Sequence, residues 1–122
     1  MTTERTPESY LPLHPLELQV LLLLTDGPKH AYRIVGGVEA RQPEWSQILP
    51  TNLYRRIWRL AAAGLIEETE PAGPEEARKR RYFAITPLGR AVAAAEAGRL
   101  RTLLTEAAAS GVVPAARAGG PR

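Results

Sequence analysis

Cysteine is absent from this sequence of 122 residues, and histidine and aspartate are scarce. Without cysteine, the chain can form no disulfide, no thiolate nucleophile and no cysteine-ligated zinc site. The two histidines, His14 and His30, lie far apart, and Asp26 is the single aspartate. These groups are too few and too scattered for a metal site or for paired acid–base chemistry. We therefore expect no metal, no cofactor and no enzymatic activity.

Long apolar runs are also missing. The longest purely aliphatic run is Val20–Leu24, whereas about 20 apolar residues are needed to span a bilayer. The first ten residues contain no apolar stretch of the kind found in signal peptides, which predicts a cytoplasmic protein. Glycine-rich phosphate-binding motifs are absent too, because Gly36-Gly37 and Gly119-Gly120 lack the surrounding pattern.

Lysine is rare, so arginine carries the positive charge. Lys29 and Lys79 are the only lysines among 16 basic residues, and 13 acidic residues leave a formal net charge of +3. Arginine suits two-point contacts with phosphate or guanine. Codon bias is the simpler explanation, because the chain is also rich in alanine, glycine and proline. A role of the arginines in binding phosphate or guanine is favoured over codon bias, because many of the basic residues gather on two predicted elements.

Composition and apolar spacing divide the chain into four predicted parts. They are a flexible arm (residues 1–11), a folded domain (12–86), a long helix (87–110) and a disordered tail (111–122). The folded domain combines a helical apolar period with a later strand period. We expect helices over Pro15–Thr25, His30–Arg41 and Pro50–Ala63, and strands over Leu65–Glu70 and Lys79–Ile85. The polar segment between the strands predicts a hairpin with a long tip.

The last predicted helix has no later element to pack against. Thr86 suits an N-cap and Pro87 the first helical position, and the helix should continue to about Ala109. Its apolar stripe must therefore meet the first helix or a second copy of the chain. The residues predicted to form a dimer interface are Leu16, Val20, Leu100, Leu103 and Leu104. Packing within one chain, against the first helix alone, is the alternative.

The order helix, helix, helix, strand, strand, long helix predicts a mainly α protein with a small β-hairpin. It is the order of a winged helix-turn-helix domain, in which the third helix enters the DNA major groove. The third helix here contains no acidic residue, and basic residues gather on one side of it. The candidate DNA contacts on this helix are Thr51, Asn52, Tyr54, Arg55, Arg56 and Arg59. The predicted β-hairpin is the wing of such a domain, and the candidate DNA contacts on it are Arg78, Lys79, Arg80 and Arg81.

Several stretches, in matching order and spacing, resemble the PadR-like transcriptional regulators. They are Leu22-Leu23-Leu24, Gly27-Pro28, His30-Ala31-Tyr32, Asn52-Leu53-Tyr54, Leu60, Ala63-Gly64-Leu65-Ile66, Arg81-Tyr82-Phe83-Ala84-Ile85-Thr86 and Gly89-Arg90. The resemblance covers roughly Leu13 to Leu104. The single, short final helix resembles the compact branch of the family. It implies a homodimer, often a repressor, that binds a palindromic operator and releases it in response to a small ligand or a stress signal.

The chain departs from the family pattern at two places. It has His30-Ala31-Tyr32 where relatives usually have His-Gly-Tyr, and Thr51-Asn52 where they usually have Gly-Thr or Ser-Thr. The second departure lies where DNA would be read, so the operator sequence cannot be transferred from relatives. The final helix also lacks aromatic residues, which argues against a ligand site of stacked aromatic rings at the dimer interface.

Other roles remain open for these candidate residues. Thr51 and Asn52 could simply cap their helix, and Tyr54 could belong to the core rather than contact a phosphate. His30 is expected to form a local hydrogen bond at a helix start, whereas Trp45 and Trp58 have no assigned role. The basic wing residues could balance the acidic residues Glu67, Glu68, Glu70, Glu75 and Glu76. The alternative function is therefore a winged-helix module that binds a protein and not DNA.

Overall fold

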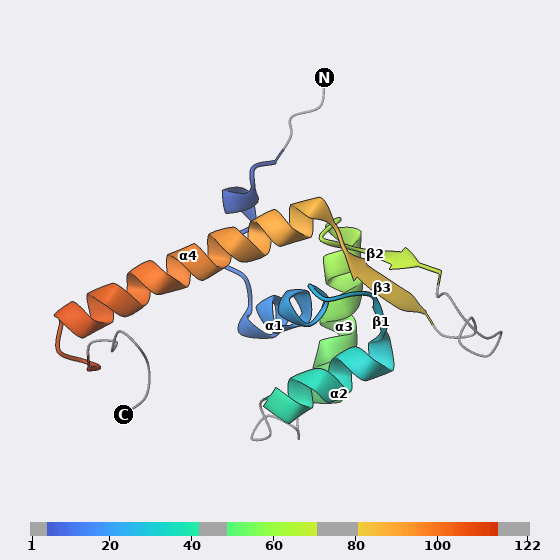
Figure 1. The fold of residues 1–122 in the computed structure, drawn as a ribbon, viewed down its shortest axis with the longest axis horizontal. Helices are drawn as coiled ribbons and strands as arrows, with labels where there is room; N and C mark the ends of the chain where they lie inside the picture. Colours follow the sequence, from blue (N-terminus) through green and yellow to red (C-terminus); the bar gives the residue numbers. More distant parts are fainter. Residues whose placement is uncertain (1–4, 42–48, 71–80, 115–122) are drawn as a thin grey trace.

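The computed structural model describes residues 5–41, 49–70 and 81–114. In chain order, the elements are η1 (Pro7–Tyr10), α1 (Pro15–Leu23), β1 (Lys29–His30), α2 (Ala31–Arg41), α3 (Leu49–Ala62), β2 (Ile66–Thr69), β3 (Tyr82–Ile85) and α4 (Pro87–Ala109). The helical domain with a small antiparallel sheet and a long final helix confirms the predicted fold class (Figure 1). Trp45 and most of the wing tip lie outside the described residues.

The core lies where α1, α2 and α3 meet the sheet and the first half of α4. Its fully buried side chains include Leu21, Ile34, Leu53, Phe83 and Val92. Apolar residues recur at helical spacing in each helix, so each helix buries one stripe against the others.

Leu16 and Val20 also belong to this core, and their predicted role requires correction. Their exposed fractions are 5% and 0%, because α1 is packed by α2, α3 and α4 within the same chain. Their side chains are thus unavailable to a second copy. The spacing of apolar residues indicated correctly that they are buried, but it could not indicate by what.

The sheet has three strands in the order β1-β3-β2, with both pairs antiparallel. The hairpin of β2 and β3 was predicted, and its register pairs Ile66 with Ile85 and Thr69 with Tyr82. Strand β1 was not predicted, since two residues are too few to show a strand period. Its pairing of His30 with Tyr82 ties the start of α2 to the central strand.

The turn between α3 and β2 and the start of α4 are joined by close contacts. The Thr86 Oγ1 accepts the backbone N–H of Gly89 at 2.9 Å, which confirms the predicted N-cap, and donates to the carbonyl oxygen of Gly64 at 2.7 Å. Gly64 has φ +82°, a conformation that favours glycine after a helix. Gly89 packs directly against the carbonyl of Leu65, so no room is left for a Cβ atom.

The N-terminal end of the described chain is packed against the domain. Residues Pro7–Tyr10 form the 3-10 helix η1, which packs on α4, and Leu11 lies partly against the core. The predicted flexible arm of residues 1–11 is therefore packed from Pro7 onward. The predicted disordered tail lies outside the described residues from position 115. No helix in the described ranges is both long and apolar enough to cross a membrane.

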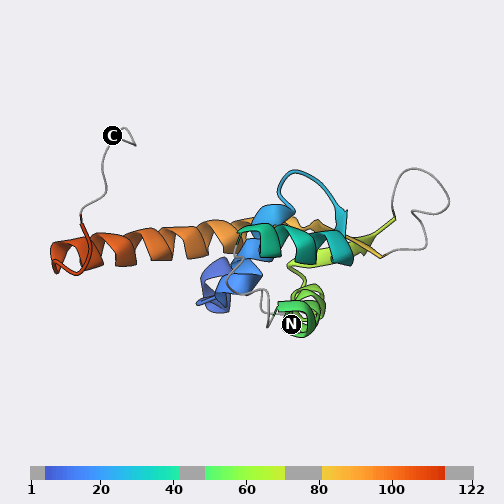
Figure 2. The same cartoon turned by 90° about the horizontal axis from the view of Figure 1, so that it is seen from below.

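The two halves of α4 have different surroundings. In the first half, Val92 and Ala93 are buried against the domain. The second half projects beyond the other helices (Figures 1 and 2). There, the exposed fractions of Leu100, Leu103 and Leu104 are 40%, 46% and 54%. We call these three residues the leucine stripe.

Glu96 is a buried carboxylate at the point where the two halves of α4 meet. It is 2% exposed and accepts two hydrogen bonds from Arg99, at 2.7 and 2.8 Å. These bonds, together with one from the backbone N–H of Leu13, lower the pKa of Glu96 despite its burial. The carboxylate thereby joins α4 to the segment that leads into α1.

Candidate nucleic-acid interface

The outer side of α3 carries basic and aromatic side chains. Arg55, Trp58 and Arg59 are exposed, and Asn52 is half-buried, whereas Leu53, Ile57 and Leu60 on the opposite side are in the core. The helix follows the predicted division into an apolar and a basic side. Thr51 lies in its first turn, but its side chain is outside the described part. This side of α3 could lie in a major groove without meeting a carboxylate of its own helix.

Arg56 differs from its two neighbours. Its side chain is 21% exposed, and its Nη1 lies 3.4 Å from Oε2 of Glu17, on α1. Arg59 is 66% exposed, and its Nη1 lies 4.0 Å from the same oxygen. The helical spacing placed Arg56 correctly beside Arg55 and Arg59, but it could not show that α1 covers that edge of α3.

Glu17 also stabilises the start of α1, a role that the sequence analysis missed. Its Oε1 accepts the backbone N–H of His14 at 3.2 Å, while the His14 Nδ1 accepts that of Leu16 at 3.1 Å. Glutamate three residues after the cap is the usual signature of this reciprocal arrangement, with histidine here in the place of serine or threonine. Burial, together with the positive charge of Arg56, lowers the pKa of His14.

Arg81 and Trp58 connect the wing to α3. The Arg81 guanidinium carbon lies 5.1 Å from the centre of the Trp58 ring, and Nε lies 3.7 Å from Oε2 of Glu68. The Trp58 ring meets Phe83 edge-on, with 5.4 Å between ring centres. Trp58, whose role was left open, thus packs under the base of the wing. Arg78, Lys79 and Arg80 lie outside the described residues.

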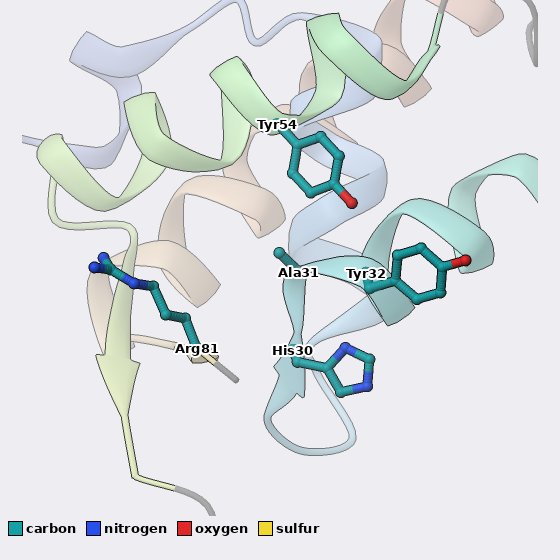
Figure 3. A pocket seen from close by; sticks show the side chains of 5 residues that line it. All are labelled: His30, Ala31, Tyr32, Tyr54 and Arg81. Atoms are coloured by element: carbon teal, nitrogen blue, oxygen red, sulfur yellow. The ribbon is translucent and has the colours of Figure 1, made fainter. Parts of the chain in front are cut away.

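A hollow of about 420 Å³ separates the starts of α2 and α3 from β3 (Figure 3). It is lined by His30, Ala31, Tyr32, Tyr54 and Arg81. Tyr54 is half-buried and points from α3 toward the start of α2, so its ring packs on the domain while its hydroxyl lies toward the hollow. The lining is mainly aromatic, and the Arg81 side chain extends from its edge away from the rings (Figure 3). Such a surface suits contact with an anionic backbone.

His30 lies at the start of α2. Its Nδ1 accepts the backbone N–H of Arg33 at 3.1 Å, as expected for a local hydrogen bond at a helix start. Its ring meets Tyr82 edge-on at 5.3 Å between centres. His30 therefore holds the wall of the hollow in place. Among the described residues, no group of three acidic or histidine side chains could hold a metal ion.

Comparison with known proteins identifies the family. The model of the transcriptional regulator PadR-like family matches residues 20–95, which is more than half of the chain. An "Uncharacterized 37.1 kDa protein in transposon TN4556" from Streptomyces fradiae is 33% identical over 87 residues, covering 71% of this chain. The chain spans 23% of the length of that relative.

Solved structures show the same fold at low identity. The transcriptional regulator BldR from Sulfolobus solfataricus has a TM-score of 0.62 at 19% identity, over 84% of this chain and 66% of its own. The transcriptional regulator Cth-833 from Clostridium thermocellum has a TM-score of 0.59 at 24% identity, over 81% of this chain and 90% of its own. Both neighbours are transcriptional regulators by name. The chain belongs to the PadR-like family of transcriptional regulators.

Proposed function

We propose that this protein is a homodimeric repressor that acts in the cytoplasm by binding a palindromic operator. Helix α3 enters the major groove, the base of the wing follows the flanking backbone, and the leucine stripe of α4 joins two copies. Bound DNA is released when a small ligand or a stress signal changes the spacing of the two α3 helices.

The acid-free outer side of α3 is the observation that carries this proposal. Arg55 and Arg59 project from it, and Arg81 lies beside it at the base of the wing. Contacts of arginine with phosphate supply affinity, and two-point contacts with guanine supply about 1–3 kcal/mol of discrimination each. The two exposed arginines and the half-buried Asn52 of α3, together with Arg81 beside them, offer both.

The dimer is supported by the leucine stripe, because three exposed leucines on a projecting helix favour burial against a partner. One domain alone would cover one half-site. Two copies would present two α3 helices about 34–36 Å apart on one side of the DNA. A repressor bound to its operator in this way blocks the promoter. A signal that alters the dimer geometry would release the DNA and relieve the block.

The first experiment is a titration of the protein onto a fluorescent duplex taken from upstream of its own gene. Anisotropy is measured at two salt concentrations, with unlabelled random duplex as competitor. Specific recognition predicts binding that resists the competitor and weakens with salt. The spacing of the protected bases then tests the palindrome. Failure to bind at low salt would contradict the proposal.

Paired variants separate DNA contacts from overall charge. We expect Arg55→Gln or Arg59→Gln to weaken specific binding roughly 5- to 150-fold, because each removes a contact worth about 1–3 kcal/mol. Arg101→Gln is the matched control, since it removes the same charge from an exposed position on α4. Equal effects of all three variants would indicate binding by net charge alone.

A protein-binding module is the second candidate, because Trp58 remains 46% exposed on the helix that would contact a partner. This second function predicts that Arg55→Gln and Arg59→Gln leave any DNA affinity unchanged. It also predicts that Trp58→Ala abolishes capture of the partner. The anisotropy titration with these variants therefore distinguishes the two functions.

A further inference from the structure

The three arginines of α3 are close together in the sequence but have different neighbours in space. Arg55 and Arg59 are exposed, whereas Arg56 is turned toward α1, with 21% of its side chain exposed. Its Nη1 is 3.4 Å from Oε2 of Glu17, a residue that is 8% exposed. Arg56 therefore already has an anionic partner inside the protein.

Glu17 is held from two sides. Its Oε1 accepts the backbone N–H of His14 at 3.2 Å, and its Oε2 faces Arg56. The carboxylate could follow Arg56 toward a DNA phosphate only by giving up its contact at the start of α1. The Glu17 carboxylate is consequently held in place at the start of α1, and Arg56 pairs with a fixed partner.

Exchange of Glu17 for a phosphate would leave a buried carboxylate without its cation, which is strongly unfavourable. The Nε of Arg56 is also buried, and it has no hydrogen-bond partner among the described residues. Arg59 is in the opposite situation. It is 66% exposed at 4.0 Å from the same oxygen, and exposed ion pairs of this kind contribute little and exchange easily.

We propose that Glu17 gives the arginines of α3 two different roles. It keeps Arg56 as a structural link between α1 and α3, and it leaves Arg55 and Arg59 to contact DNA. Glu17 and Arg56 are thus positioning residues, which affect DNA binding through the placement of α3. The DNA part rests on the proposed function, whereas the link between the two helices does not.

The salt dependence of DNA binding counts phosphate contacts and so separates the three arginines. A plot of log K against log salt concentration loses about 0.9 in slope for each phosphate contact removed. We expect a loss of about one in slope for Arg55→Gln or Arg59→Gln if the residue contacts phosphate, and a specific affinity weaker by roughly fivefold or more if it contacts a base. Arg56→Gln keeps the wild-type slope but lowers the Tm by several degrees. A slope reduced by about one in Arg56→Gln would overturn the proposal.

A double variant covers the case in which Arg56→Gln fails to fold. Glu17→Gln combined with Arg56→Gln removes both charges and keeps a polar side chain at each position. We expect it to keep the wild-type slope and to be folded even if Arg56→Gln alone is not, because neither charge is left buried alone. Where both single variants fold, the double variant should lose less Tm than the sum of their losses. Strictly additive losses of Tm would refute the link between α1 and α3, and a lower slope would refute the exclusion of Arg56 from DNA.

A measurement on the unmodified protein completes the test. NMR signals of the arginine Nε–Hε groups are recorded while the upstream duplex is added. The signals of Arg55 and Arg59 should shift, and that of Arg56 should stay in place; a comparable shift of Arg56 contradicts the proposal. If the wild-type protein binds no duplex, the proposed function and the DNA part fail together. Comparing the Tm values of the two single variants and the double variant still decides whether Glu17 links Arg56 to α1.

Discussion

The two halves of α4 share one helix and have opposite surroundings. From Gly89 to Glu96, buried residues face the domain, and the Thr86 side chain caps the helix start. From Leu100 onward, the leucine stripe faces outward, with 40–54% of each leucine exposed. The first half is stabilised by its own chain, whereas the second half has apolar surface that its own chain leaves uncovered.

This difference shows what an apolar stripe can and cannot indicate. In both halves, the spacing of apolar residues follows the helical period. The spacing shows which side of a helix is apolar, but it does not show whether the same chain or another one covers that side. Substitutions at four places in α4 test this contrast, beginning with the largest expected effect.

The largest effect is expected at Gly89, in the first half. A Cβ atom there would overlap the carbonyl of Leu65 and press on the Ile85 side chain, so α4 would have to move away from the sheet. We expect Gly89→Ala to lower the free energy of unfolding by about 3 kcal/mol or more. Urea unfolding measures this change. Wild-type stability in the variant would show that α4 is not fixed at this point.

The second effect concerns association rather than folding. Replacing Leu100, Leu103 and Leu104 by Gln should weaken the proposed dimer at least a hundredfold, because its apolar contact would be lost. The unfolding of the monomer should change little, since all three side chains are exposed in it. Sedimentation equilibrium measures the dissociation constant. Arg101, Thr102 and Thr105, which are exposed on the same helix, provide a control triple variant in which dimerisation should persist.

The third effect depends on pH. The Arg99 hydrogen bonds hold the pKa of Glu96 below its ordinary value, so its ionised form stabilises the folded state above the ordinary glutamate pKa. That stabilisation is lost as the pH falls through the lowered pKa. Glu96→Gln should cost about 1–2 kcal/mol at neutral pH, and the difference from wild type should shrink in acid. Exposed Glu106, in the second half, is the control, and Glu106→Gln should change stability by less than about 0.5 kcal/mol at neutral pH.

The smallest effect is expected at Gly98, which has open space around its Cα atom. Gly98→Ala should raise the free energy of unfolding by about 0.5–1 kcal/mol, because alanine favours a helix and nothing is displaced. Measuring the thermal unfolding of Gly98→Ala and Gly89→Ala in parallel compares the same substitution in the two halves of α4. A destabilised Gly98→Ala protein would indicate that the second half is packed more closely than its surroundings suggest.

Local signals in the sequence predicted most of the fold. The Thr86 cap, the stop at Gly64 and the helical spacing of core residues such as Leu53 and Ile57 each depend on neighbours within a few positions. Such signals can be read directly from a sequence. The strand of Lys29 and His30 was missed because its existence depends on β3, which lies far along the chain.

The candidate site was predicted less completely, because its geometry depends on contacts between distant segments. The position of Arg56 on α3 could be read from the sequence, but its pairing with Glu17 brings together residues 39 positions apart. Similarly, the aromatic character of Trp58 gave no sign that Arg81 and Phe83 pack against it. The capping signature of Glu17 after His14 could have been recognised, and it would have identified Glu17 as a fixed carboxylate.

The carboxylate of Glu96 has a mechanical consequence for the long helix. It ties α4 to Leu13, next to the first turn of α1, where Glu17 in turn holds Arg56 of α3. The part of α4 beyond Glu96 is roughly 20 Å long, and Glu96 lies where this part leaves the domain. A tilt of about 5° at this point would move the far end by about 2 Å. In the proposed homodimer, a modest change where the two leucine stripes meet would therefore act on the α1 segment that supports α3.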